Sequence, residues 1–214
     1  MDASLYAYPD LGPAPQRPWV RTNFVVTVDG SAQDESGVSG TLGGEADHRA
    51  FQAMREACDV VVVGAGTARD EGYGPTDRPL VLVTRRLDVP EKLRTSGVLV
   101  LTTTDADTDL AASLESDGVE VLRHGTGTID WEPALEALAA RGWTKVLCEG
   151  GPHLHGELVE QDLVDEVCLT VAPALVAGEG LRPAQSNQAV RRDLRLAHVV
   201  EEDGVLLTRW VRDR

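Results

Sequence analysis

Two glycine-containing turns carry the chemistry that this sequence suggests most directly. The apolar run Val146–Cys148 leads through Glu149 into Gly150-Gly151-Pro152, and the apolar run Asp59–Val63 leads into Gly64-Ala65-Gly66-Thr67. Glycine lets a backbone turn sharply and come close to a ligand. The start of a following helix adds unpaired N–H groups and the positive end of the helix dipole, which together attract phosphate. Two such turns predict a ligand with more than one phosphate, such as a dinucleotide.

The two turns differ in how specific they are. Arg69 stands where the dinucleotide fingerprint needs a glycine, and the segment lacks the Gly-Lys-Ser/Thr of a Walker loop. A plain tight turn therefore explains Gly64–Thr67 about as well as a phosphate site does. The Gly150-Gly151-Pro152 turn is more specific, because both glycines stand where a strand ends.

Charged residues near the expected strand ends allow a functional and a structural interpretation. Arg85-Arg86 follow the run Leu80–Thr84, where two arginines are commonly a solvated edge but can also clamp a ribose 2′-phosphate, which favours NADP over NAD. Asp29 belongs to an Asp-Gly turn that it can stabilise, and its place at the mouth of a sheet also permits ligand contact. A carboxylate at Glu149 is costly beside an apolar strand unless it is paired.

Histidine and cysteine spacing argues against a metal centre. His153 and His155 are two residues apart, so in a helix they point to different faces, and no Cys/His cluster supports zinc. We therefore predict no metal. The three cysteines, Cys58, Cys148 and Cys168, lie in or next to apolar runs and are expected to be buried, reduced thiols, which fits a cytoplasmic location.

Composition excludes several classes of partner. The 214 residues carry a net charge of −15, which disfavours binding to nucleic acid or to an anionic membrane surface. No apolar run approaches the ~20 residues of a membrane-spanning helix, and the N-terminus lacks the pattern of a signal peptide. A phosphate ligand must therefore be held locally, by main-chain amides and a few arginines.

The elements that would position these residues alternate between strand and helix. Residues 1–18 are expected to form an irregular arm, and residues 19–214 a single domain. The Gly- and Ser-rich stretch Ser31–Gly44 predicts a loop of functional length. Alternating strands and helices predict an α/β fold, and the hairpin expected around Asp203-Gly204 makes the central sheet mixed. Expected strands are 20–28, 59–63, 80–84, 98–101, 119–122, 144–148, 164–171, 194–201 and 205–211; expected helices are 45–57, 110–114, 129–140 and 152–161.

The chain resembles the reductase domain of riboflavin biosynthesis, which has the dihydrofolate reductase-like fold. The resemblance rests on Phe24–Gly30, Val61–Thr67 with Glu71–Gly74, Glu149–Leu154, and Leu163–Glu166 leading to Ala172–Gly178. It implies a three-layer α/β/α fold with a mixed, mainly parallel sheet, a homodimer, and NADPH as hydride donor. The implied substrate is 5-amino-6-(5-phosphoribosylamino)uracil or a related ribosylaminopyrimidine.

The resemblance also implies which residues form the site. Cofactor contacts are expected at Val26, Thr41, Gly64, Gly66, Thr67, Glu71, Thr84, Arg85, Arg86, Gly150, Gly151, Pro152, His153 and Leu154. Substrate contacts are expected at Asn23, Asp29, Ser39, Arg55, Arg78 and Glu149. The family's usual Ser-x-Trp in the substrate loop is Ser39-Gly40-Thr41 here, which removes an aromatic lid. The chain also lacks the H-x-E and P-C-x-x-C motifs of the zinc deaminase that many bacterial relatives carry.

The implied reaction is hydride transfer from NADPH to a C=N carbon, with a proton delivered to the nitrogen. Glu149 and Asp29 are the leading candidates for catalytic groups, and Glu71 or an ordered water are alternatives. Arg55, and with it Arg78, would hold the substrate phosphate. Two other functions stay open: a pterin or folate reductase of the same fold, and a non-catalytic NADP-binding protein.

Overall fold

The computed structural model describes residues 2–13 and 15–213. Its contacts group into two compact units. The first comprises the chain up to Pro9 together with Trp19–Cys58 and the residues from Leu147 onward, and the second comprises Asp10–Pro18 and Asp59–Val146. The single domain expected for residues 19–214 stays a prediction beside this division.

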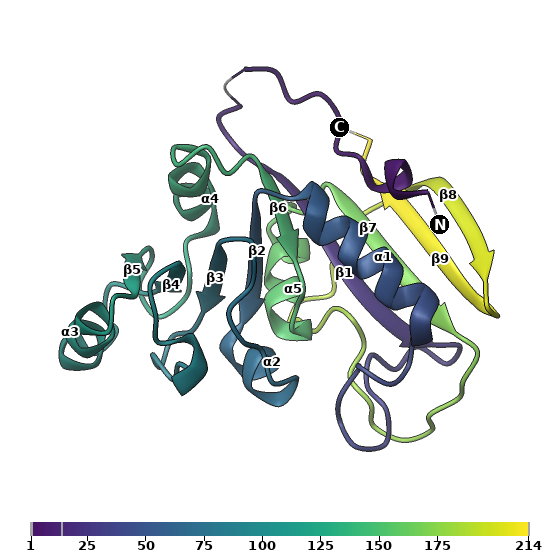
Figure 1. The fold of residues 1–214 in the computed structure, drawn as a ribbon, viewed down its shortest axis with the longest axis horizontal. Coiled ribbons are helices and arrows are strands. Elements are labelled where there is room, and N and C mark those ends of the chain that lie inside the picture. Colours follow the sequence, from purple (N-terminus) through teal and green to yellow (C-terminus); the bar gives the residue numbers. More distant parts are fainter. Residues whose placement is uncertain (1, 14, 214) are drawn as a thin grey trace. The chain divides into compact units, whose positions relative to one another are not determined.

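The first unit is built on a mixed sheet. Strand β1 (Trp19–Thr27) pairs in parallel with β7 (Glu166–Ala172), which pairs antiparallel with β9 (Val205–Val211), and β9 continues antiparallel to β8 (Arg195–Glu202). Helix α1 (Gly44–Ala57) crosses one face of this sheet, and a short 3-10 turn, η1 (Ala3–Tyr6), lies by β9 (Figure 1). Helix α5 (Pro152–Glu160) also belongs to this unit.

The second unit is built on parallel strands. Its order is β5 (Glu120–Arg123), β4 (Val98–Thr102), β3 (Leu80–Val83), β2 (Val60–Gly64). Its helices are α2 (Ala65–Asp70), η2 (Glu91–Leu93), α3 (Thr108–Ser116) and α4 (Trp131–Ala139). The chain leaves this unit and enters the first within β6 (Lys145–Cys148). The predicted α/β fold, with a mainly parallel sheet and a C-terminal hairpin, is confirmed.

Burial patterns explain why these segments adopt these structures. Strands β2 and β4 are buried along nearly their whole length, as expected for parallel strands covered on both faces. Strand β7 instead alternates buried and half-buried residues, which is the period of a strand with one more open face. Helix α4 buries Trp131, Ala134, Leu135 and Leu138, at the spacing of one helical face.

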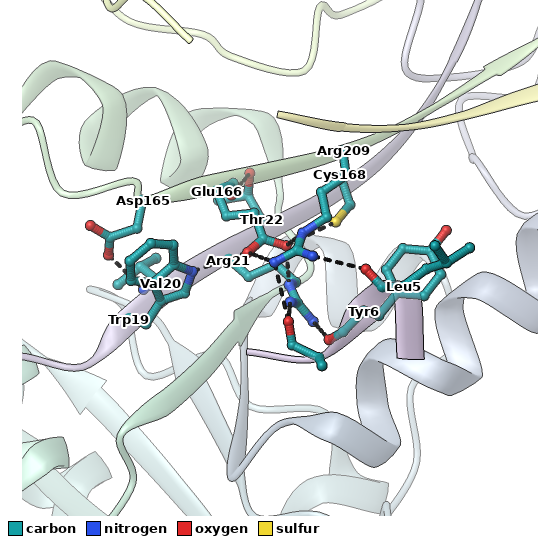
Figure 2. A network of polar contacts seen from close by, with 11 residues as sticks. Leu5, Tyr6, Trp19, Val20, Arg21, Thr22, Asp165, Glu166, Cys168 and Arg209 are labelled. Atoms are coloured by element: carbon teal, nitrogen blue, oxygen red, sulfur yellow. Dashed lines mark hydrogen bonds and ion pairs between the residues drawn. The ribbon is translucent and has the colours of Figure 1, made fainter. Parts of the chain in front are cut away.

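A buried ionic network anchors the start of the chain to the first unit (Figure 2). The carboxylate of Glu166 accepts hydrogen bonds from Arg21 Nε at 2.6 Å and Arg209 Nε at 2.8 Å, and Glu166 and Arg21 are fully buried. The two guanidinium groups also donate to the carbonyl oxygens of Tyr6 and Leu5. The expected irregular arm therefore contains an ordered turn, held through its main chain.

Electrostatics keep this network charged although it is buried. Burial alone would raise the pKa of Glu166, but the positive charges of Arg21 and Arg209 and their hydrogen bonds bring that pKa below its usual value. Burial raises the pKa of Tyr6, whose ring lies edge-on to His198 at 5.8 Å. Among the residues that the structure describes, no helix is long and apolar enough to cross a membrane.

Candidate functional site

The Gly150-Gly151 turn connects β6 to α5 in the first unit. Gly150 has a φ of +92°, and a Cβ atom there would lie 3.1 Å from the Phe24 ring, so backbone and packing both call for glycine. The peptide bond between the two glycines is cis. Gly151 is the N-cap of α5 and Pro152 stands in its first turn, where a missing N–H costs nothing. No side chain of the described residues caps this helix start, which leaves main-chain N–H groups to meet an anion.

The residues that follow this turn divide between surface and core. His153 is exposed, whereas Leu154 and His155 are buried. The His155 ring stacks on Phe24 with centroids 4.8 Å apart, and Phe24 in turn underlies Gly150. Because burial disfavours the imidazolium, the pKa of His155 falls to about 4. His153 and His155 thus lie on different faces of α5, as the sequence predicts, whereas no role was predicted for His155.

Glu149, which directly precedes Gly150 in the chain, forms a bidentate ion pair with Arg55 of α1. Arg55 Nε donates to Glu149 Oε1 and Arg55 Nη2 to Oε2, both at 2.7 Å. The Glu149 side chain is 2% exposed and that of Arg55 20%, and the guanidinium also lies over the Phe51 ring at 4.2 Å. Both oxygens of the carboxylate thus accept charge-assisted hydrogen bonds from one guanidinium. Arg55 and Glu149, both predicted to contact the substrate, thus contact each other in this structure.

Asp29 lies at the carboxyl end of β1. Its carboxylate accepts a hydrogen bond from the Thr27 hydroxyl and one of 3.2 Å from the Val176 N–H. These bonds, that of Thr27 first, lower the pKa of Asp29. Asn23, in the middle of the same strand, has a buried Oδ1 without a hydrogen-bond partner. An unsatisfied buried amide oxygen is costly, so Asn23 fits its predicted ligand contact.

The loop between β1 and α1 is organised by an aspartate that the sequence did not single out. Asp34 accepts hydrogen bonds from the N–H and hydroxyl groups of Ser36, from the Val38 N–H and from the Thr41 hydroxyl at 2.6 Å. The bonds from Ser36 and Thr41 lower the pKa of Asp34 to about 2. The loop is thus ordered around its own polar groups, and the carbonyl of Ser39 accepts the Leu42 N–H. Thr41, predicted to contact the cofactor, uses its hydroxyl within this loop.

The second unit brings several predicted cofactor residues to one edge. Gly64 pairs in register with Val83, so Thr84, Arg85 and Arg86 begin one residue beyond it at the same carboxyl edge. Both arginines are exposed, whereas Thr84 is buried. A Cβ atom at Gly66 would meet only the end of the Arg69 side chain, at 3.9 Å. Gly66 and Thr67 lie in the first turn of α2, which is only six residues long, so its dipole is weaker than that of a longer helix.

Arg78 lies at the other end of this unit. It comes just before β3 and lines an open cavity of about 510 Å³ formed at the amino ends of β3, β4 and β5. Four strand residues span ~13 Å, so Arg78 is not brought to the edge that carries Arg85. Glu71 caps the C-terminal end of α2. The ligand contacts expected at Arg78 and Glu71 stay predictions. The position of Arg78, at the amino end of β3, does not support a ligand contact there.

Val26, predicted to contact the cofactor, and the three cysteines are buried. Val26 lies on β1 opposite Val171. The three cysteines, all of them among the described residues, are buried and form no disulfide bond, as predicted. Burial raises the pKa of Cys148 to about 12, so this thiol is unreactive at neutral pH.

Comparisons with known proteins agree with this arrangement. One protein family, described as the RibD C-terminal domain, matches residues 18–207. The 2,5-diamino-6-ribosylamino-4(3H)-pyrimidinone 5′-phosphate reductase of Methanothermobacter thermautotrophicus is 27% identical over 208 residues, covering 87% of this chain and 95% of that protein. The riboflavin biosynthesis protein RibD of Corynebacterium ammoniagenes is 34% identical over 167 residues, covering 78% of this chain but 46% of RibD.

A solved structure has the same fold as this chain. The crystal structure of a pyrimidine reductase-like protein from Corynebacterium diphtheriae superimposes with a TM-score of 0.87 at 26% identity. The superposition covers 99% of this chain and 98% of that one, so the likeness includes the N-terminal arm as well as the strands and helices.

Proposed function

Because the chain belongs to the RibD C-terminal domain family, we propose that it is an NADPH-dependent reductase of a ribosylaminopyrimidine 5′-phosphate in riboflavin biosynthesis. The names of the relatives support the reaction class, and the Methanothermobacter reductase matches this chain over nearly its full length. We expect 5-amino-6-(5-phosphoribosylamino)uracil, or its 2,5-diamino counterpart, as the substrate.

The observation that carries the nucleotide part of this proposal is the Gly150-Gly151 turn. Its helix start has no side-chain cap, and its first glycine is required by both φ and packing. We propose that the main-chain N–H groups of Gly151, His153 and Leu154 hold a phosphate of the pyrophosphate. These features fit a dinucleotide.

Residues of the second unit support the choice of NADPH over NADH. Arg85 and Arg86 are exposed directly after β3, and an arginine fork matches the geometry of a 2′-phosphate. Gly66 lacks any packing reason to be glycine, since the space where its Cβ would lie is open to the approach of a ligand.

The chain's own residues would orient the substrate and control its protonation. When bound, the nicotinamide supplies the hydride that reduces the C=N carbon of the opened ribosylamine. Glu149, fixed by Arg55, would accept N–H groups of the pyrimidine ring, and Asp29, whose pKa is lowered, would stay ionised at neutral pH. Because Arg55 occupies both oxygens of Glu149 and Asp29 already accepts two hydrogen bonds, we propose that a water molecule protonates the nitrogen.

A second copy of this chain is the partner that we propose, as the family resemblance implies. Apolar side chains line one face of the β7–β9–β8 sheet, where the register places Trp210 between Val167 and Leu196. Leu206 and Val199 on the same face are 41% and 52% exposed. A surface of this kind is typical of an interface. Three buried thiols that form no disulfide bond in the described chain support the proposed cytoplasmic location.

The test is NADPH oxidation, followed by absorbance, with each of the two ribosylaminopyrimidine phosphates and with dihydrofolate. We expect turnover with at least one pyrimidine and none with dihydrofolate. The variant Arg55→Lys keeps the charge but loses the fork on Glu149, and should lower kcat/KM at least tenfold. Turnover of dihydrofolate alone would instead establish a folate reductase, and NADPH binding without any turnover a non-catalytic binding protein.

A further inference from the structure

A segment of the first unit connects the loop after β1 to helix α5. We call residues 180–186 the strap. At one end, the Ala32 N–H donates to the Leu181 carbonyl at 2.7 Å, and a Cβ at Gly180 would lie 2.2 Å from Ser31 Oγ. At the other end, the Gln185 N–H donates to the Pro152 carbonyl at 2.9 Å. The strap therefore contacts both the predicted substrate loop and the first turn of the predicted cofactor helix.

His155 is the side chain that holds the middle of the strap against the sheet. Its Nδ1 lies 3.0 Å from the Pro183 carbonyl oxygen, and its Nε2 lies 3.3 Å from the Thr22 hydroxyl. A carbonyl oxygen only accepts hydrogen bonds, so Nδ1 must carry the proton. In a neutral imidazole the bare Nε2 then accepts from Thr22. Each nitrogen has one partner, and together they fix the ring between β1 and the strap.

Packing around α5 makes the same connection tight. The main chain of Gln185 passes so close to Gly156 that a Cβ there would lie 1.9 Å from the Gln185 carbonyl oxygen. The His155 ring also stacks on Phe24, which lies beside Gly150. A shift of His155 would therefore move both the glycine turn and the strap.

From this geometry we infer that His155 is a positioning residue, which holds the strap so that the Ser31–Gly44 loop and the Gly150-Gly151 turn keep one fixed arrangement. The consequence for catalysis rests on the proposed function. A preorganised arrangement lowers the cost of ordering both ligands at once. Loss of this contact should raise the KM values for NADPH and for the pyrimidine more than it lowers kcat.

The experiment uses two substitutions that each keep one half of the histidine. His155→Asn retains a donor near the position of Nδ1 for Pro183, whereas His155→Gln reaches toward Thr22 and loses the strap. We expect amide hydrogen exchange at Ala32 and Gln185 to become at least tenfold faster in His155→Gln and to stay near the wild-type rate in His155→Asn. Exchange at the core residue Leu207 should not change in either. Both KM values should follow the same order.

Two further variants keep the test decisive. Gly156→Ala pushes on the strap without altering His155, so it should also speed exchange at Ala32, even where His155→Gln fails to fold. His48→Gln makes the same chemical change at an exposed position of α1 and should leave exchange and kinetics unchanged. Equal exchange in His155→Gln and wild type, or equal losses in the Gln and Asn variants, would overturn the inference. If wild type binds no NADPH, the proposed function fails while the exchange results still test the role of His155.

Discussion

Gly150 and Gly66 are both glycines in predicted phosphate-binding turns, but for different reasons. Gly150 has a positive φ, and a Cβ atom there would lie 3.1 Å from the Phe24 ring, so the fold itself favours glycine. Gly66 adopts an ordinary helical conformation with open space beside it, and there the fold gains nothing from glycine. A residue that weakens its own helix without a packing reason is best explained by what must approach it from outside.

This difference predicts opposite effects on stability and binding for Gly66→Ala. We expect the variant to be as stable as wild type or more stable by up to about 1 kcal/mol, because alanine favours the helix. NADPH should bind at least tenfold more weakly, as measured by fluorescence titration. Gly74→Ala, where the space is also open and φ is not positive, is the matched control and should bind normally. Unchanged binding in Gly66→Ala would argue against a cofactor at this turn.

His155 also predicts a pH dependence of stability. Its pKa is about 4 in the folded protein because burial disfavours the charged ring, against about 6.5 in the unfolded chain. Between these values the unfolded state binds the proton and the folded state does not, so this contribution is complete above pH ~6.5 and falls as the pH drops toward 4. The loss is on the order of 3 kcal/mol. Urea unfolding of wild type and His155→Asn at several pH values measures this effect, and wild type should lose more stability on acidification. If the free energies of unfolding of the two proteins fall in parallel with pH, His155 does not cause this pH dependence.

At the scale of elements, most helices and strands follow from local patterns, while the links between them do not. The apolar runs Val60–Val63 and Val167–Val171 each predict a strand from neighbouring residues alone. The anchoring of η1 depends instead on Arg21 and Glu166, which are 145 residues apart in the chain. Nothing in the local sequence around either residue indicates that they meet.

The buried network predicts a large effect of neutralising Glu166. In Glu166→Gln, the buried Arg21 loses its counter-charge, and Arg209 loses its ion pair with the same carboxylate. We expect the free energy of unfolding to fall by about 3–5 kcal/mol, the usual cost of removing one partner of a buried ion pair. Chemical denaturation measures this directly. Glu45→Gln, at an exposed glutamate with a longer contact to Arg49, is the control and should change stability by less than about 1 kcal/mol.

At the scale of the whole molecule, the apolar face of β7, β9 and β8 predicts self-association. A lysine in place of Leu206 would put a charge into that face, so Leu206→Lys should be monomeric at concentrations where wild type is a dimer. Light scattering should then report 23.0 kDa for the variant and twice that mass for wild type. Leu110→Lys, at an exposed leucine of α3, should remain dimeric. A monomeric wild type would rule out the proposed dimer.

Much of the candidate site could be predicted because its parts are short and local. The strand–glycine–helix turn at Gly150, the exposed arginines after β3 and the buried cysteines are each recognisable within a few residues, since φ preferences, helix starts and hydrophobic periodicity act over that range. The element bounds differ from the predicted ones by a residue or two, as at Trp19–Thr27 and Thr108–Ser116, where ends depend on capping and packing.

Other features depend on contacts between distant segments, and only folding brings those segments together. The fork between Arg55 and Glu149 turns two predicted ligand contacts into partners, and the placement of Arg78 at the amino end of β3 separates it from Arg85. The strap reaches His155 from residues nearly thirty positions further along the chain. Local preferences describe what each segment can become, whereas side-chain pairing across the fold depends on the register and packing of many segments at once.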